Sequence, residues 1–283
     1  MILVADKRQG MPCLYREGSP NLILVADNLQ ITNPLIEKAV QDMDPDPIQE
    51  MVRQCEAAGA EMIDINSGPL SREPERKMAF LLEAVQSVSD LPVLIDTANP
   101  KAIEAGLRAN QKQAIINGFS LEPAKLEQIL PLAKKFDADI IGYLLYPNSH
   151  VPNDEAERLS VAVELFGEFR KMDIDKERLI IDPIIAPVIW QNGNFQDMEI
   201  LSVLRHLPEL LDFPVRTIAG LSNLTTGKGP KDKKGLLERT YLPMLAASGL
   251  SMVMLNVFHD ETLRVARACN VLRDDKIFAW EAL

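Results

Sequence analysis

The sequence is poor in the residues that build disulfide frameworks and metal sites. Its 283 residues include only three cysteines and three histidines. The cysteines, Cys13, Cys55 and Cys269, lie far apart with no CxxC pair, and the histidines are equally scattered. Disulfide frameworks and zinc sites depend on characteristically spaced ligands. The sequence therefore predicts neither a disulfide-stapled fold nor a protein-bound metal.

Long apolar runs and positive charge are also scarce. Apolar runs such as 22–26 fall far short of the roughly 20 residues that cross a bilayer, and no secretory segment opens the chain. The chain has 30 Lys and Arg residues against 41 Asp and Glu residues, a net charge of -11, which argues against a nucleic-acid partner. We therefore expect a cytoplasmic protein that binds a small molecule or another protein, and neither nucleic acid nor membrane.

Short apolar runs alternate with longer amphipathic segments eight times along the chain, which is typical of βα units in a parallel sheet. Helix starts at Pro47, Pro74, Pro100 and Asn153 and a helix end at Gly59 agree with this division. The pattern predicts an α/β protein with a single (β/α)8 TIM barrel over residues 21–283. The expected strands are 22–26, 62–65, 93–95, 114–116, 139–144, 179–181, 215–219 and 252–255.

Residues 1–20 lie outside this scheme and form a short N-terminal extension. The sequence Ile-Leu-Val-Ala-Asp occurs at 2–6 and again at 23–27, with glycines and prolines between the two copies. Two matched strands joined by a turn would make a β-hairpin at the bottom of the barrel. Chance similarity between two strand-forming segments explains the repeat equally well.

Polar residues, nearly all Asp or Asn, follow seven of the eight expected strands. In a parallel barrel the carboxyl ends of the strands meet at one mouth, where the active site lies. Any single Asp or Asn there could instead cap a helix or form a turn, but the repetition favours a binding site. The candidates are Asp27, Asn28, Asp64, Asn66, Asp96, Asn99, Asn117, Asp182, Ser222, Asn223 and Asn256.

A mouth of short carboxylates and carboxamides suits a neutral ligand rich in hydrogen-bond donors and acceptors, such as an amino-pteridinone ring. It does not suit a phosphoester. Gly227-Lys228 lacks the Walker spacing from Gly220, and no GxGxxG motif opens a helix. The basic segment 227–234, which contains Lys228, is either a solvated loop or an arm that attracts a glutamyl tail or an acidic partner.

Several segments together resemble the methyltetrahydrofolate:corrinoid protein methyltransferases. They are Met-Ile-Asp-Ile-Asn-Ser-Gly-Pro at 62–69, Ile-Asp-Thr-Ala-Asn-Pro at 95–100 with its continuation to 107, Ile-Asp-Pro at 181–183 and Gly-Leu-Ser-Asn at 220–223. Their order and spacing agree with the family, as do 44–47 and 238–241. The resemblance extends over roughly 22–272, nearly the whole chain.

The resemblance implies a pterin-binding barrel, usually a homodimer, that moves a methyl group between N5 of tetrahydrofolate and the cobalt of a corrinoid on a separate carrier protein. Asp64, Asn99 and Asp182 match positions that bind the pterin, and Asn223 matches the asparagine that reaches N5, the expected catalytic residue. Asn66, Asp96, Asn117 and Ser222 are further expected pterin contacts, and the expected contacts of the mouth or folate tail are Asp27, Asn28, Asn256 and Lys228.

The chain departs from this family in two places. Relatives commonly end the first strand Gly-Glu-Arg-Ile-Asn, whereas this chain has Ala-Asp-Asn-Leu-Gln at 26–30, and the segment 187–196 is also different. No histidine stands in the Asp-x-His-x-x-Gly context of a corrinoid carrier, so the corrinoid is expected on another protein.

Two other functions stay open. Dihydropteroate synthase resembles this barrel, but it needs a basic phosphate site and a Ser-Thr-Arg-Pro-like loop that 67–72 does not match. A folate-binding subunit without catalysis is the other. The resemblance fits either direction of methyl transfer within one-carbon metabolism. It therefore does not choose between a role in acetyl-CoA metabolism and a role in O-demethylation.

Overall fold

A computed structural model of the chain describes residues 21–70, 72–274 and Trp280. Eight parallel strands pair in chain order, and β8 pairs with β1 to close the barrel. The strands are β1 (Ile23–Gln30), β2 (Met62–Asn66), β3 (Val93–Asp96), β4 (Ala114–Phe119), β5 (Asp139–Tyr143), β6 (Leu179–Asp182), β7 (Arg216–Gly220) and β8 (Met252–Leu255). The predicted (β/α)8 fold is confirmed.

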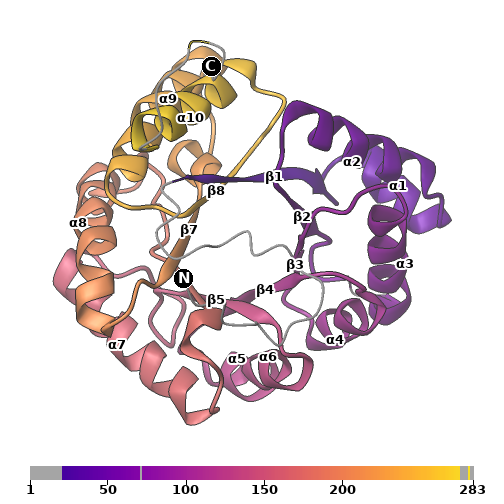
Figure 1. The fold of residues 1–283 in the computed structure, drawn as a ribbon, viewed down its shortest axis with the longest axis horizontal. Helices are drawn as coiled ribbons and strands as arrows, with labels where there is room; N and C mark the ends of the chain where they lie inside the picture. The colour runs from indigo at the N-terminus through magenta and orange to yellow at the C-terminus, as the bar shows by residue number, and fades with distance from the viewer. Residues whose placement is uncertain (1–20, 71, 275–279, 281–283) are drawn as a thin grey trace, which may run out of the picture.

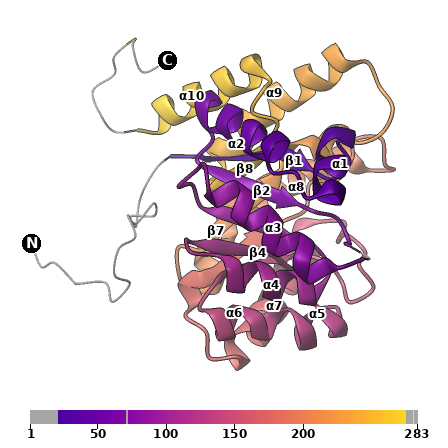
Figure 2. The same ribbon diagram turned by 90° about the vertical axis from the view of Figure 1, so that its right-hand side faces the viewer.

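Helices surround the strands as an outer ring that follows chain order (Figure 1). They are α1 (Pro34–Asp42), α2 (Asp46–Ala58), α3 (Pro74–Gln86), α4 (Pro100–Ala109), α5 (Pro123–Gln128), α6 (Leu130–Phe136), α7 (Glu155–Lys171), α8 (Gly193–Leu211), α9 (Lys231–Ala247) and α10 (Asp260–Arg273), with short 3-10 helices η1 (Lys176–Arg178) and η2 (Leu221–Thr225). The ring closes where Arg267 of α10 donates to the carbonyl of Ala58 at the end of α2, 2.8 Å away, and Figure 2 shows these two helices side by side.

Alternation of side chains along the strands divides the core into two parts. One row faces the helices and forms the larger hydrophobic cluster between the strands and the outer ring. The other row fills the barrel interior near the amino ends of the strands and is here called the apolar floor. Its buried members are Ile23, Val25, Met62, Leu94, Ile115, Ile141, Ile180, Ile218 and Met252. This packed apolar layer is a closed floor beneath the mouth.

The local signals placed most helix boundaries correctly. Prolines occupy the first helical turn of α2, α3 and α4, and Gly59 ends α2 with a φ of 98°, in the left-handed region that favours glycine. One predicted cap is wrong. The N-cap of α7 is Asp154, whose carboxylate accepts from the Glu157 amide, because the helix begins one residue later than the asparagine predicted.

Strands β1 and β4 extend further than expected, to Gln30 and Phe119. The reason for β1 is that its last residues still pair with β2, where Gln30 lies opposite Asn66. Asp27, Asn28 and Asn117 therefore belong to strands rather than to the loops after them. Strand alternation consequently decides which of their side chains face the barrel interior.

The proposed N-terminal hairpin of residues 1–20 lies outside the described residues. Within the described part of the chain, no helix combines the length and apolar character that a membrane crossing demands.

Candidate functional site

Directly above the apolar floor, most inward-facing positions become polar. Two residues beyond six of the nine floor residues along their strands stand Asp27, Asp64, Asp96, Asn117, Tyr143 and Asp182, here called the upper layer. Lateral pairing brings three polar residues side by side, because Asn66 lies opposite Asp96 and Asp96 lies opposite Asn117. The barrel therefore converts a sequence pattern spread over about 150 residues into one contiguous polar surface at the mouth.

Asp64 of β2 is the most unusual member of this layer. Its exposed fraction is 0%, and neither carboxyl oxygen has a hydrogen-bond partner among the described residues. Burial, together with the negative charges of Asp96 and Asp27, raises the pKa of Asp64 well above its ordinary value. Buried polar groups are almost always hydrogen-bonded, since an unpaired one costs stability. This carboxyl is therefore set up to receive donors from a ligand.

Asp96 is the centre of a hydrogen-bond network across three strands. The Asn66 side-chain amide donates to Asp96 Oδ2 at 2.7 Å, and the Tyr143 hydroxyl donates to Asn117 Oδ1. Burial raises the pKa of Asp96 to about 6, against the lowering effects of a hydrogen bond from Asn117 and the charge of Lys125. Asp96 thus shares one polar wall with Asn66, Asn117 and Tyr143.

Asp182 lies at the end of β6 on another side of the mouth. It is 7% exposed, and its Oδ1 accepts from the Ile184 amide at 2.8 Å. Burial raises the pKa of Asp182 to about 7, only partly offset by this backbone hydrogen bond. This backbone hydrogen bond occupies Oδ1, so Oδ2 can accept from a ligand.

Asn99 is placed differently from the other candidates. Its side-chain oxygen caps α4 by accepting from the amides of Lys101 and Ala102, at 3.1 and 3.4 Å. Its side-chain nitrogen lies 3.4 Å from the carbonyl of Pro69. The structure thus gives Asn99 the cap role that any asparagine after a strand could have, at the edge of the mouth beside the loop after β2.

Ser222 and Asn223 are exposed residues of η2, directly after β7. The inward position at the end of β7 is Gly220, and a Cβ added there would lie 3.2 Å from the Asn223 side-chain nitrogen. Glycine thus leaves room for the Asn223 carboxamide at a place where other strands carry their own polar side chain. Asn223 can therefore point a hydrogen-bond donor over the same mouth.

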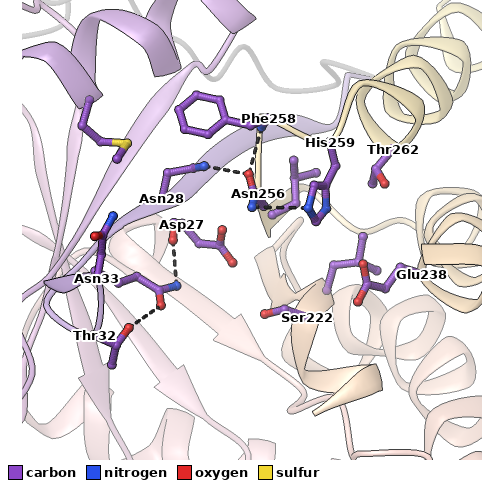
Figure 3. A pocket seen from close by; sticks show the side chains of 14 residues that line it. Asp27, Asn28, Thr32, Asn33, Ser222, Glu238, Asn256, Phe258, His259 and Thr262 are labelled. Atoms are coloured by element: carbon purple, nitrogen blue, oxygen red, sulfur yellow. Dashed lines mark hydrogen bonds between the residues drawn. The ribbon is translucent and has the colours of Figure 1, made fainter. Parts of the chain in front are cut away.

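A cavity of about 510 Å³ opens beside this layer, between the ends of β1 and β8 and the helices α9 and α10. Figure 3 shows Asp27, Ser222, Glu238 and His259 around it. Burial and the charge of Glu238 raise the pKa of Asp27 to about 6, against lowering by His259 and a hydrogen bond from Ser222. The cavity thus contains two neighbouring acids.

Asn28 and Asn256 are tied to each other on the rim of this cavity (Figure 3). The Asn28 side-chain nitrogen donates to Asn256 Oδ1 at 2.7 Å, and Asn28 Oδ1 accepts from the Val257 amide at 3.0 Å. Lys228 is exposed in the connection between η2 and α9. The predicted candidates therefore separate into the upper layer with Asn66 beside it, two residues of η2, the helix cap Asn99, a rim pair and an exposed lysine.

Tyr143, Glu238 and His259 escaped the sequence reasoning. Tyr143 could have been found, because it stands two residues beyond the floor residue Ile141 on the one expected strand that no polar candidate follows. Glu238 comes from within α9 and His259 from the connection into α10, where no sequence spacing relates them to Asp27. Among the described residues, no group of three or more His, Cys, Asp or Glu is arranged to hold a metal.

Comparison with known proteins identifies the family of this chain. A family model described as "Pterin binding enzyme" matches residues 33–256. The methylcorrinoid:tetrahydrofolate methyltransferase of Eubacterium limosum is 24% identical over 211 residues, which cover 73% of this chain and 75% of that protein. The methionine synthase of Mycobacterium leprae is 18% identical over 84% of this chain, but the match spans only 20% of that longer protein.

Solved structures with the same fold include two dihydropteroate synthases. The enzyme of Xanthomonas albilineans in complex with 7,8-dihydropteroate has a TM-score of 0.64 at 17% identity, covering 89% of this chain and 94% of its own. The Clostridium difficile enzyme, in the presence of pteroic acid, has a TM-score of 0.66 at 15% identity, covering 91% and 99%. At this identity the likeness concerns the fold. The family match extends over most of the barrel and includes every residue of the upper layer except Asp27, so the chain belongs to the pterin binding enzyme family.

Proposed function

We propose that this protein is a methyltransferase that moves a methyl group between N5 of tetrahydrofolate and the cobalt of a corrinoid carried by a separate protein. Its family and the activity for which the Eubacterium limosum relative is named support this reaction. The single observation that carries the proposal is the fully buried, unpartnered carboxyl of Asp64 in a mouth lined by other acids and amides. A donor-rich pterin ring accounts for that carboxyl.

The upper layer, apart from Asp27, would bind the pterin through hydrogen bonds from ring N–H and exocyclic NH2 groups. Asp64 and Asp182 would accept these bonds, each contributing on the order of 1.5 to 3 kcal/mol because the acceptor is charged. Asp96, with Asn66 and Asn117, would contact the remaining polar edge of the ring. The apolar floor below would exclude water from these bonds and so strengthen them.

Methyl transfer from 5-methyltetrahydrofolate breaks a bond to a tertiary amine, which is a poor leaving group. The bound corrinoid supplies a strongly nucleophilic metal centre. The protein must favour positive charge at N5 as the bond breaks, and Asn223 would do so by donating a hydrogen bond that strengthens along the reaction. A carboxamide does not gain or lose a proton near neutral pH. Asn223 would therefore orient N5 and stabilise its positive charge, and the proton itself would come from another group.

The carrier of the corrinoid would be a second protein that docks over the mouth. No histidine of the full sequence lies in the Asp-x-His-x-x-Gly context that ligates cobalt in such carriers. We also propose a homodimer in the cytoplasm, in line with the family resemblance and the soluble character of the sequence. Lys228 and its basic neighbours would attract the folate glutamyl tail or the carrier.

The test is methyl exchange between 5-methyltetrahydrofolate and reduced cobalamin, followed by the change in cobalt absorption. We expect enzyme-dependent exchange, which becomes faster with a corrinoid carrier protein. Pterin binding without any exchange, with free cobalamin or with a carrier, would contradict methyl transfer and leave a folate-binding subunit. Formation of dihydropteroate from 4-aminobenzoate and the pterin diphosphate would instead identify a dihydropteroate synthase.

A further inference from the structure

The cavity of Figure 3 contains acids that the proposed pterin contacts leave unused. Asp27 lies at the end of β1 with 9% exposure, and Glu238 of α9 lines the same cavity. The Thr225 hydroxyl donates to Glu238 and so fixes this carboxyl beside η2. Both acids thus lie next to the short helix that contains Ser222 and Asn223.

The proposed reaction needs a titratable group at this place. When the N5–methyl bond breaks, its electron pair stays on N5, and a proton must arrive there to leave a neutral amine. Asn223 can donate a hydrogen bond but cannot give up a proton. Asp64, Asp96 and Asp182 are occupied as acceptors for the ring if they bind the pterin. Ser222 lines the same cavity as Asp27 and precedes Asn223 directly, so its hydroxyl is the group on hand to connect Asp27 to the reacting edge of the mouth.

We propose that Asp27 holds the proton that N5 takes up during demethylation, and that the Ser222 hydroxyl passes it on. This inference rests on the methyltransferase proposal. The Asp27 carboxyl loses its proton to the Ser222 oxygen, the Ser222 hydroxyl proton moves to N5, and Asp27 is left as a carboxylate. In the reverse direction N5–H loses its proton along the same path, and Asp27 becomes a carboxylic acid.

The surroundings of Asp27 suit such a proton-holding residue. Glu238 from α9 faces it and raises its pKa, whereas His259 from the connection into α10 lowers it. The charge of Asp27 in turn raises the pKa of Asp64 on β2 and of the Cys55 thiol on α2. With burial as the largest cause, the pKa of Asp27 is about 6, close to the value at which an acid both keeps and releases a proton near neutral pH.

The cavity supplies the route by which Asp27 exchanges protons with solvent. Its volume of about 510 Å³ is enough for several water molecules. Asn28, Thr32 and Asn256 line it and provide polar partners for such water. A small carboxylic acid would also fit, which makes chemical rescue possible after the Asp27 side chain is removed.

The experiment compares single-turnover methyl transfer to free cob(I)alamin in wild type, Asp27→Ala, Asp27→Glu and Glu238→Gln. Removal of the carboxyl is expected to slow transfer about 10² to 10⁴-fold, the usual contribution of a positioned proton donor, with little change in 5-methyltetrahydrofolate affinity. Added acetate should restore part of the Asp27→Ala rate in proportion to its concentration. Asp27→Glu should retain more activity than Asp27→Ala.

The pH profile separates proton supply from a structural role. Wild type should show an inflection near the Asp27 pKa of about 6. Glu238→Gln should move this inflection to lower pH because it removes the neighbouring negative charge. Glu61→Gln is the matched control. Glu61 is a partly buried acid at the opposite end of the barrel, where it accepts from the Leu24 amide at 3.0 Å, and this variant should keep both the rate and the inflection.

The possible results of this experiment separate the proton transfer by Asp27 from the methyltransferase function on which it rests. No transfer by wild type would overturn the methyltransferase proposal. The role of Asp27 alone would be overturned if wild type transfers the methyl group and an Asp27→Ala variant that binds the pterin keeps the wild-type inflection. Such a variant would also either stay within about threefold of the wild-type rate or show no response to acetate. Pterin binding, measured by fluorescence, verifies that each variant is folded.

Discussion

Two buried aspartates at opposite ends of the barrel show how differently the two ends are built. Asp139, at the amino end of β5, is 3% exposed. Its carboxyl oxygens lie 3.0 Å from Arg216 Nη1 and 3.4 Å from Arg178 Nη1, and the Gln113 side-chain amide donates to it at 3.1 Å. Asp64, near the carboxyl end of β2, is fully buried with no hydrogen-bond partner among the described residues.

The difference teaches which end is structural and which is functional. A buried carboxylate surrounded by guanidinium groups and an amide has its charge compensated within the protein, so it can lock neighbouring strands together. An unpartnered carboxyl costs stability and persists where something outside the chain completes it. The apolar floor separates the two ends, and the acids above it are therefore the ones available to a ligand.

Among variants that probe this comparison of the two ends, the largest effect is expected from Asn223→Ala at the upper end. Loss of the donor near N5 should reduce single-turnover methyl transfer about 10² to 10³-fold, as for removal of a donor in an oxyanion hole. Pterin affinity should change less than about threefold, because Asn223 is exposed on η2 and, in the proposed reaction, its hydrogen bond strengthens only in the transition state. Stopped-flow absorption gives the rate and fluorescence titration the affinity. Equal losses in both would contradict the assigned role.

At the lower end, Asp139→Ala should destabilise the fold and spare the ligand. Removal of the carboxylate leaves Arg178 and Arg216 without their shared partner, which should lower the free energy of unfolding by about 3 kcal/mol. Denaturant unfolding measures this loss. The pterin affinity of the folded variant should equal that of wild type, and a marked fall in affinity would break the division between the two ends.

Asp182→Asn should weaken ligand binding and stabilise the fold, the reverse of what is expected for Asp139→Ala. Replacing a charged acceptor should weaken pterin binding about 10 to 100-fold, from a loss of roughly 1.5 to 3 kcal/mol. Burial raises the Asp182 pKa from 3.8 to about 7, so the folded state binds the extra proton and the wild type loses stability as pH rises from about 4 through 7. A neutral asparagine avoids this loss.

The unliganded Asp182→Asn variant should therefore melt at higher temperature than wild type at pH 8, with a gain on the order of 2 kcal/mol. The difference should shrink towards pH 4, where the wild-type carboxyl is protonated in both states. Thermal unfolding at the two pH values checks this. A variant less stable than wild type at pH 8 would mean that Asp182 is structural like Asp139.

The smallest effect is expected from Tyr143→Phe. This variant loses the hydroxyl that donates to Asn117, while the ring keeps its place beside the floor. Pterin affinity should fall about two- to tenfold, which corresponds to roughly 0.5 to 1.5 kcal/mol for one neutral hydrogen bond. Fluorescence titration measures this loss, and Asn117→Ala should lose more affinity, because it removes the pterin contact as well as this hydrogen bond.

The barrel could be predicted because eight apolar strand segments and their helix signals are local in sequence. The carboxylates at 64, 96 and 182 could be predicted because each stands directly at or beyond an apolar run, so barrel geometry alone brings them together. The proximity of Asp27 to Glu238 could not be predicted from the sequence, since it depends on how α9 packs beside η2. Nor could sequence distinguish Asn99, which caps α4, from Asn117, which faces the barrel interior.

The pH dependence of pterin affinity tests the central claim most directly. If the acids of the upper layer accept hydrogen bonds from the ring, they must be ionised in the complex, whereas burial raises the pKa of Asp96 to about 6 and that of Asp182 to about 7 in the free protein. The dissociation constant for 6-hydroxymethylpterin should therefore fall at least about tenfold between pH 5.5 and 7.5, with protons released on binding. A dissociation constant that stays level or rises over this range would contradict the account.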